Sequence, residues 1–138
     1  MTVLILEDDA IQAAALEKRL IRDLDAKVDA IATELEFWRR VQSAEGITAD
    51  VAVVDMMLRW TDPSPTMVLP PDDIIREGFY TAGLRCCREL RKRNIRCVIF
   101  TALDPGKIPL REEEKIPIIN KSRGFEPLVQ EIKQPSSP

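Results

Sequence analysis

The sequence predicts one α/β domain built on a parallel sheet with helices on both faces. Five short runs of aliphatic and β-branched residues alternate with segments in which apolar residues recur at helical spacing. The runs are apolar on both faces, which is typical of strands buried between two helical layers. The chain has 138 residues, enough for one domain with a substantial core. The predicted strands cover residues 2–6, 27–32, 49–54, 97–101 and 116–120.

The helices are predicted between these strands from apolar periodicity and from their starting residues. The first follows an acidic pair, Asp8 and Asp9, either of which can cap its N-terminus. The second starts at Thr33, with Glu36 three residues later in a capping-box-like pattern. The predicted helices cover residues 10–22, 33–43, 78–93 and 125–133.

Two stretches and the end of the chain are not expected to form long regular elements. Residues 59–76 contain four prolines within nine residues, which disfavours regular structure. Residues 104–114 contain two prolines and a glycine, so they are weakly helical at best. Residues 135–138 are expected to form a disordered tail.

Composition narrows the function classes. The chain is 45% hydrophobic and 31% charged, with a net charge of −3, as in soluble globular domains. It contains no histidine, which excludes Ser-His and Cys-His catalytic pairs and the usual zinc ligands. No apolar run approaches the ~20 residues that span a bilayer, and no signal peptide is evident, so the expected location is the cytoplasm. The three cysteines are interpreted as small core or helix-face residues.

Chemically active side chains follow the predicted strands. Because the carboxyl ends of parallel strands meet at one edge of the sheet, side chains at these ends can form a common site. Like charges at such an edge repel, and a hard divalent cation with oxygen ligands relieves that repulsion; Mg²⁺ suits one or two carboxylates with waters and a phosphate. The residues at the strand ends are Glu7, Asp8, Asp9, Asp55, Thr101, Ala102 and Lys121.

Asp55 is the most informative of these residues. It closes the apolar run VAVV and is followed at once by Met56 and Met57. Aspartate is depleted in strands, and a carboxylate among aliphatic residues is costly unless its charge is compensated. A functional role for this carboxylate is therefore expected.

These motifs together resemble the receiver domain of two-component response regulators. LILEDD resembles the first strand of that family with its acidic pair, VAVVDMML its phosphoacceptor strand, VIFTAL its Thr-Ala signature and IINKS its lysine strand. Gly83 resembles the glycine that opens the third helix of the family. The resemblance implies a flavodoxin-like sheet with strand order 2-1-3-4-5, and a receiver domain over residues 1–134.

The resemblance also implies a role for each site residue. Asp55 would be the nucleophile that accepts a phosphoryl group, with Lys121 and Thr101 as its catalytic partners. Mg²⁺ would be held by Asp8, Asp55, the backbone carbonyl of Met57 and, through water, Glu7. Ala102 and Met57 would line the phosphoryl pocket, and helix capping is the expected job of Asp9.

The implied function is that of a stand-alone phosphoacceptor in a two-component phosphorelay. Its partners would be a sensor histidine kinase or a histidine phosphotransfer protein, together with a downstream protein that the sequence does not name. Enzymatic activity would at most be self-phosphorylation from a phosphodonor and slow autodephosphorylation. Neither nucleic acid nor a membrane is an expected partner.

The sequence departs from the family pattern in two regions. Asp55 and Gly83 are 28 positions apart, so residues 59–77 are interpreted as an inserted loop. This segment is either a solvated insertion or a flap over the phosphorylation site in which Arg59 or Trp60 controls access. The family usually has an aromatic residue at the position of Ile118, and its fourth helix is longer than residues 104–114 allow.

Two other functions fit parts of the sequence. A receiver-fold interaction module that signals without phosphorylation is favoured by Ile118 and the altered fourth helix. The retained acidic, hydroxyl and lysine residues oppose it. A hydrolase with an aspartate nucleophile, similar to haloacid-dehalogenase-like phosphatases, is disfavoured because Met57 stands where that family has its second aspartate, which leaves no general acid.

Overall fold

The computed structural model describes residues 1–134; the tail expected at 135–138 lies outside this range. Strands are β1 (Thr2–Leu6), β2 (Lys27–Ile31), β3 (Val51–Val54), β4 (Arg96–Thr101) and β5 (Ile118–Asn120). The α-helices are α1 (Ala10–Leu24), α2 (Glu34–Gln42), α3 (Asp72–Glu77), α4 (Ala82–Lys92) and α5 (Glu126–Lys133). Three single-turn 3₁₀ helices complete the described fold: η1 (Phe79–Thr81), η2 (Pro105–Lys107) and η3 (Lys121–Arg123).

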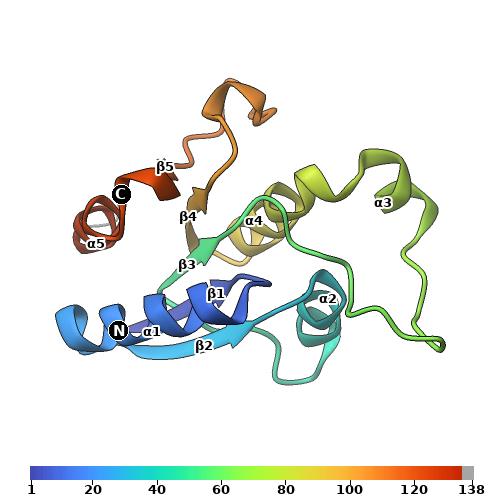
Figure 1. Ribbon diagram of the computed structural model, residues 1–138, viewed down its shortest axis with the longest axis horizontal. Helices are drawn as coiled ribbons and strands as arrows, with labels where there is room; N and C mark the ends of the chain where they lie inside the picture. Colours follow the sequence, from blue (N-terminus) through green and yellow to red (C-terminus); the bar gives the residue numbers. More distant parts are fainter. Residues whose placement is uncertain (135–138) are drawn as a thin grey trace.

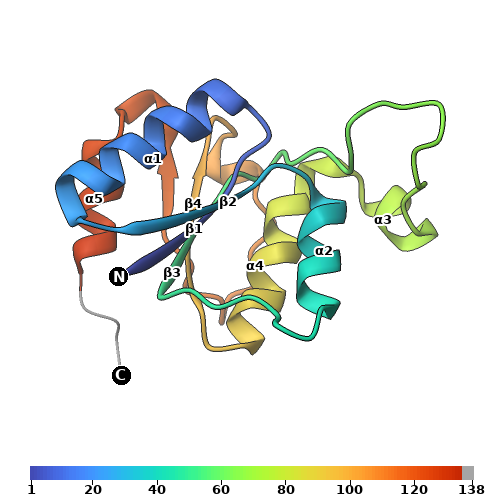
Figure 2. The same cartoon turned by 90° about the horizontal axis from the view of Figure 1, so that it is seen from below.

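The five strands form one parallel sheet between two helical layers (Figure 1). Their order is β2-β1-β3-β4-β5, as predicted. Helices α1 and α5 cover one face of the sheet, and α2 and α4 cover the other (Figure 2). The predicted flavodoxin-like architecture is therefore confirmed.

The core consists of two apolar clusters separated by the sheet. Successive side chains of a strand point to opposite faces. In β1, Val3 and Ile5 pack with α1 and α5, while Leu4 and Leu6 pack with α2 and α4. Burial on both faces explains why the strands read as continuous apolar runs. All three cysteines are buried and free, and Cys86 and Cys87 belong to the cluster under α2 and α4.

Most predicted elements occur with shifts of a few residues at their ends. Two strands begin two residues later than expected, at Val51 and Ile118. Asp9 caps α1: its carboxylate accepts hydrogen bonds from the backbone N–H groups of Ile11 and Gln12, at 3.0 and 3.1 Å. Side-chain capping of this kind satisfies the otherwise unpaired donors of a helix start.

The stretch expected to be irregular over 59–76 ends in the short helix α3, which extends to Glu77. Pro71 precedes this helix, and Asp72 and Asp73 lie in its first turn, where negative charge interacts favourably with the helix dipole. Gly78 ends it with a φ of 82°. The prolines all precede the helix, so their density did not exclude regular structure after Pro71.

Helix α2 holds the beginning of the 59–77 segment. The backbone N–H groups of Glu34 and Leu35 donate to the carbonyl oxygens of Arg59 and Trp60, at 2.8 and 2.9 Å. The first N–H groups of a helix have no partner within the helix, so the segment satisfies them. Beyond Trp60 the segment projects away from the sheet before it returns through α3 (Figure 1).

The carboxylate of Glu34 holds the other end of the segment through Arg85. Glu34 is 1% exposed, and its two oxygens accept from Arg85 Nε and Nη2 at 3.0 and 2.8 Å. Arg85 also donates to Glu77 Oε2, at the end of the segment, at 3.1 Å and to the carbonyl oxygen of the next residue, Gly78, at 3.0 Å. Trp38 Nε1 donates to Glu34 at 2.9 Å. One residue of α2 therefore contacts the start of the segment directly and its end through a buried ion pair.

Residues between β4 and β5 contain only the single turn η2, in agreement with the weak helical pattern. An ion pair attaches this stretch to α4: Arg88 donates from Nε and Nη2 to the two oxygens of Glu114, at 3.0 and 2.9 Å. The hydrogen bond from Arg88 lowers the pKa of Glu114 from 4.5 to about 2.

Loss of the Arg85 side chain is expected to destabilise the fold strongly. Arg85→Ala would leave the carboxylate of Glu34 buried and without its cation, which costs about 3–5 kcal/mol in comparable pairs. Urea unfolding measures the change. Arg93→Ala, which removes an exposed pair with Glu89, should cost less than about 1 kcal/mol. Equal effects of the two substitutions would contradict a structural role for the buried pair.

Stability is expected to fall in acid partly through Glu114. Its folded-state pKa is lowered to about 2, so its contribution is complete above about 4.5 and is lost as the pH falls from 4.5 towards 2. Glu114→Gln should therefore flatten the pH dependence of the free energy of unfolding in this window. Glu113→Gln removes the same charge from an exposed neighbouring side chain and is the control for the change in net charge.

Candidate functional site

The carboxylate of Asp55 lies at the carboxyl edge of the sheet between a hydroxyl and an ammonium group. Asp55 directly follows β3 and is 7% exposed. Thr101 Oγ1, at the end of β4, donates to Asp55 Oδ1 at 2.9 Å. Lys121 Nζ, directly after β5, donates to Asp55 Oδ2 at 2.9 Å. Three neighbouring strands thus deliver one residue each to the same point.

Two further carboxylates from the loop after β1 complete an acidic cluster. Lys121 Nζ also donates to Glu7 Oε1 at 2.5 Å, so one ammonium group bridges Glu7 and Asp55. Oxygen atoms of Glu7, Asp8 and Asp55 all lie within 4.8 Å of one another. Three oxygen ligands so placed fit a hard divalent cation such as Mg²⁺.

The electrostatics of the site follow from burial and from these contacts. Burial raises the pKa of Glu7 above 4.5, and the charge of Asp55 adds to this effect, although the hydrogen bond from Lys121 opposes it. Burial alone would lower the pKa of Lys121, but its hydrogen bonds to Glu7 and Asp55 outweigh burial and raise it. Lys121 is therefore protonated at neutral pH and compensates the charge of the cluster.

Gly83 allows α4 to pack directly on the backbone of Asp55. A Cβ atom at this position would lie 2.2 Å from the carbonyl oxygen of Asp55 and 2.7 Å from Cα of Met56. The backbone N–H of Gly83 donates to the carbonyl oxygen of Met56 at 3.0 Å. The glycine thus fixes the backbone that presents the Asp55 carboxylate.

The remaining predicted residues occupy different positions around the carboxylates. Ala102 is exposed at the end of β4, and Met57 is half-buried, with its backbone N–H 3.4 Å from Asp55 Oδ1. Asp9 serves as the cap of α1. The structure therefore gathers Glu7, Asp8, Asp55, Thr101 and Lys121, and assigns Asp9 to capping.

One contact of the site was not specified by the sequence pattern. Arg59, at the start of the 59–77 segment, donates from its backbone N–H to Asp8 Oδ2 at 3.0 Å, and its Nε lies 3.5 Å from the same oxygen. The position of Arg59 four residues after Asp55 suggested proximity to the site but did not identify this partner. The proposal that the segment forms a flap over the site stays a prediction.

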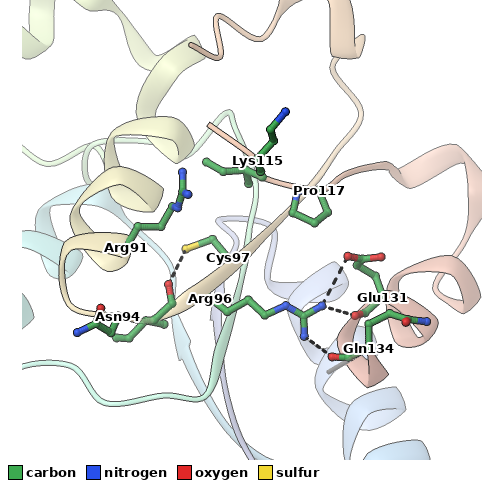
Figure 3. Close-up of a pocket in the computed structure, with 10 residues that line it drawn as sticks. Arg91, Asn94, Arg96, Cys97, Lys115, Pro117, Glu131 and Gln134 are labelled. Carbon is green, nitrogen blue, oxygen red and sulfur yellow. Dashed lines mark hydrogen bonds and ion pairs between the residues drawn. The ribbon is translucent and has the colours of Figure 1, made fainter. Parts of the chain in front are cut away.

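Two cavities lie at opposite ends of the sheet. One of about 550 Å³ borders the site, where Ala102 and Lys121 contribute to its wall. The other, of about 580 Å³, lies at the amino ends of β4 and β5 (Figure 3). There Arg96 points to the end of α5 and donates to the carbonyl oxygens of Ile132 and Gln134 at 3.2 and 2.9 Å. This second cavity lies at the edge of the sheet opposite to the acidic cluster of Glu7, Asp8 and Asp55. Its Arg96 caps the C-terminal end of α5.

The fold is similar to that of solved response regulator structures, although no protein-family model and no curated protein matches the chain. The N-terminal domain of a response regulator/sensory box/GGDEF protein from Carboxydothermus hydrogenoformans has a TM-score of 0.66 at 15% identity, over 96% of this chain and 91% of that chain. A receiver protein from Pseudoalteromonas atlantica has a TM-score of 0.65 at 17% identity, over 97% and 95% of the two chains.

Response regulator TrrA from Thermotoga maritima, solved in complex with Mg²⁺ and BeF, has a TM-score of 0.65 at 16% identity and covers 96% of each chain. The chain therefore has the fold of response regulator receiver domains, with an acidic cluster at the expected edge of the sheet. No helix within residues 1–134 combines the length and apolar character that crossing a bilayer requires.

Substitution of Gly83 is expected to disturb both stability and the site. In Gly83→Ala the new methyl group would overlap the Asp55 carbonyl, so helix and backbone must separate, at a cost of about 1–3 kcal/mol typical of overpacking. Thermal unfolding measures this loss. Gly106→Ala is the control, because its Cβ would meet only a side-chain oxygen of Asp104 at 3.6 Å. A Gly83→Ala protein as stable as Gly106→Ala would contradict the close packing.

Proposed function

We propose that the protein is a phosphoacceptor receiver of a two-component phosphorelay. Asp55 accepts a phosphoryl group from a phosphohistidine of a sensor histidine kinase or a histidine phosphotransfer protein. The phosphorylated domain then signals through contact with another protein. The observation that carries this proposal is the carboxylate of Asp55, bound by Thr101 and Lys121 and placed beside Glu7 and Asp8.

The side chains of the site account for the chemistry of transfer. A carboxylate oxygen of Asp55 attacks phosphorus, the bond from phosphorus to the donor nitrogen breaks, and an acyl phosphate forms. Lys121 is protonated and lies 2.9 Å from the attacking carboxylate, so it can stabilise negative charge on the phosphoryl oxygens. Thr101 can donate to a phosphoryl oxygen, and the small side chain of Ala102 leaves room for that group.

The carboxylates provide the ligands for a divalent cation. Asp8 and Asp55 would bind Mg²⁺ directly, together with the backbone carbonyl of Met57, and Glu7 would act through water. The ion would supply positive charge to the phosphoryl oxygens. The complex of the similarly folded TrrA with Mg²⁺ and BeF supports this choice of metal.

A second candidate function is an interaction module that signals without phosphorylation. One feature favours it: the stretch between β4 and β5, where receivers usually carry a full helix, contains only the single turn η2. The intact carboxylate, hydroxyl and ammonium contacts at Asp55 favour the phosphoacceptor.

Phosphorylation is expected on incubation with acetyl phosphate and Mg²⁺. Intact-mass measurement should show the gain of one phosphoryl group in the wild type. Asp55→Asn, which lacks the nucleophilic oxygen, and wild-type protein treated with a chelator should show no gain. If the wild type gains no mass, and beryllofluoride also fails to change its tryptophan fluorescence, the phosphorylation-independent module is favoured instead.

A further inference from the structure

The guanidinium group of Arg59 lies at the outer edge of the acidic cluster. Its Nε is 3.5 Å from Asp8 Oδ2, the oxygen that also accepts the backbone N–H of Arg59. Asp8 is one of the three residues whose carboxylate oxygens lie within 4.8 Å of one another. A side chain of fixed positive charge thus contacts a carboxylate that a divalent cation would use.

Positive charge is divided within the cluster. Lys121 bridges Glu7 and Asp55, whereas Asp8 is paired with Arg59. A divalent cation at the cluster would approach a carboxylate that already has a cation, and the two positive charges would repel. Binding of the metal is therefore opposed unless the guanidinium moves.

We propose that Arg59 competes with the divalent cation for Asp8, so that the first residue of the 59–77 segment sets the Mg²⁺ affinity of the site. This inference rests on the proposed function, because it assumes that the cluster binds Mg²⁺. It assigns to the segment a local electrostatic role at its first residue, independent of whether the remainder covers the site.

Asp62 is a second partner of the same guanidinium and can keep it when it leaves Asp8. Arg59 Nη1 lies 3.2 Å from Asp62 Oδ1, and the side chains of Arg59 and Asp62 are 47% and 78% exposed. A solvated arginine with a second carboxylate nearby can leave the first at little cost. Asp62 should therefore favour metal binding, whereas Arg59 should oppose it.

Calorimetric titration with MgCl₂ tests the proposal in the wild type and three variants. Arg59→Gln should lower the Kd for Mg²⁺ about two- to fivefold, a range based on the energies of exposed ion pairs. Asp62→Asn should raise the Kd, because it removes the alternative partner. In the double variant Arg59→Gln/Asp62→Asn, the increase in Kd caused by Asp62→Asn should largely disappear, since Asp62 acts through the arginine. Tryptophan fluorescence, to which Trp60 next to Arg59 contributes together with Trp38, gives a second readout of the same midpoints.

Arg93→Gln is the matched control, because it makes the same change in net charge at an exposed arginine that directly follows α4 and is paired with Glu89 of that helix. Equal Mg²⁺ affinities in Arg59→Gln and Arg93→Gln would overturn the proposal, as would weaker binding in Arg59→Gln. Asp55→Asn separates the two levels of inference. If neither the wild type nor Arg59→Gln binds Mg²⁺ more tightly than Asp55→Asn does, the metal site itself is wrong and the proposed function fails with it.

Discussion

The ammonium group of Lys121 is the interaction on which the site depends. It connects Glu7 and Asp55, which are 114 and 66 positions away in the sequence, and both carboxylates are largely buried. Without a cation, ionising both carboxylates would be costly, because they are buried and lie close to each other. The order β1-β3-β4-β5 across the sheet brings the three residues together, so the topology and the charge balance depend on each other.

The sequence predicted the fold and most of the site because both depend on repeating local patterns. Apolar runs identified the five strands, and parallel strands place their carboxyl ends at one edge, so residues such as Asp55 and Lys121 could be grouped without a structure. The helix α3 was not predicted, since the prolines before it outweighed the favourable acidic residues of its first turn. The partners of Arg59 and Glu34 were not predicted either. These contacts join segments that are far apart in the sequence, and local periodicity does not indicate which distant segments meet.

The 59–77 segment is an ordered part of the fold where it meets the body of the protein. The carbonyl oxygens of its first two residues accept hydrogen bonds from the first backbone N–H groups of α2. The side chain of Arg85 donates hydrogen bonds to Glu77 and Gly78 at its other end. Arg59 connects this structure to the acidic cluster through Asp8. Two contacts, Asp8 with Arg59 and Arg59 with Glu34, therefore connect the cluster to α2, a helix on the opposite side of the sheet from α1 and α5.

Glu34 has a consequence for how this protein can vary over evolutionary time. Its backbone binds Arg59, and its carboxylate binds the arginine that holds Gly78, so a single residue fixes the separation of the two ends of the segment. Once the ends are fixed, the entropy of closing the chain between them changes slowly with length, by about 0.6 kcal/mol for each doubling. The residues between can therefore diverge in length and sequence among descendants of this gene while the carboxylates keep their geometry.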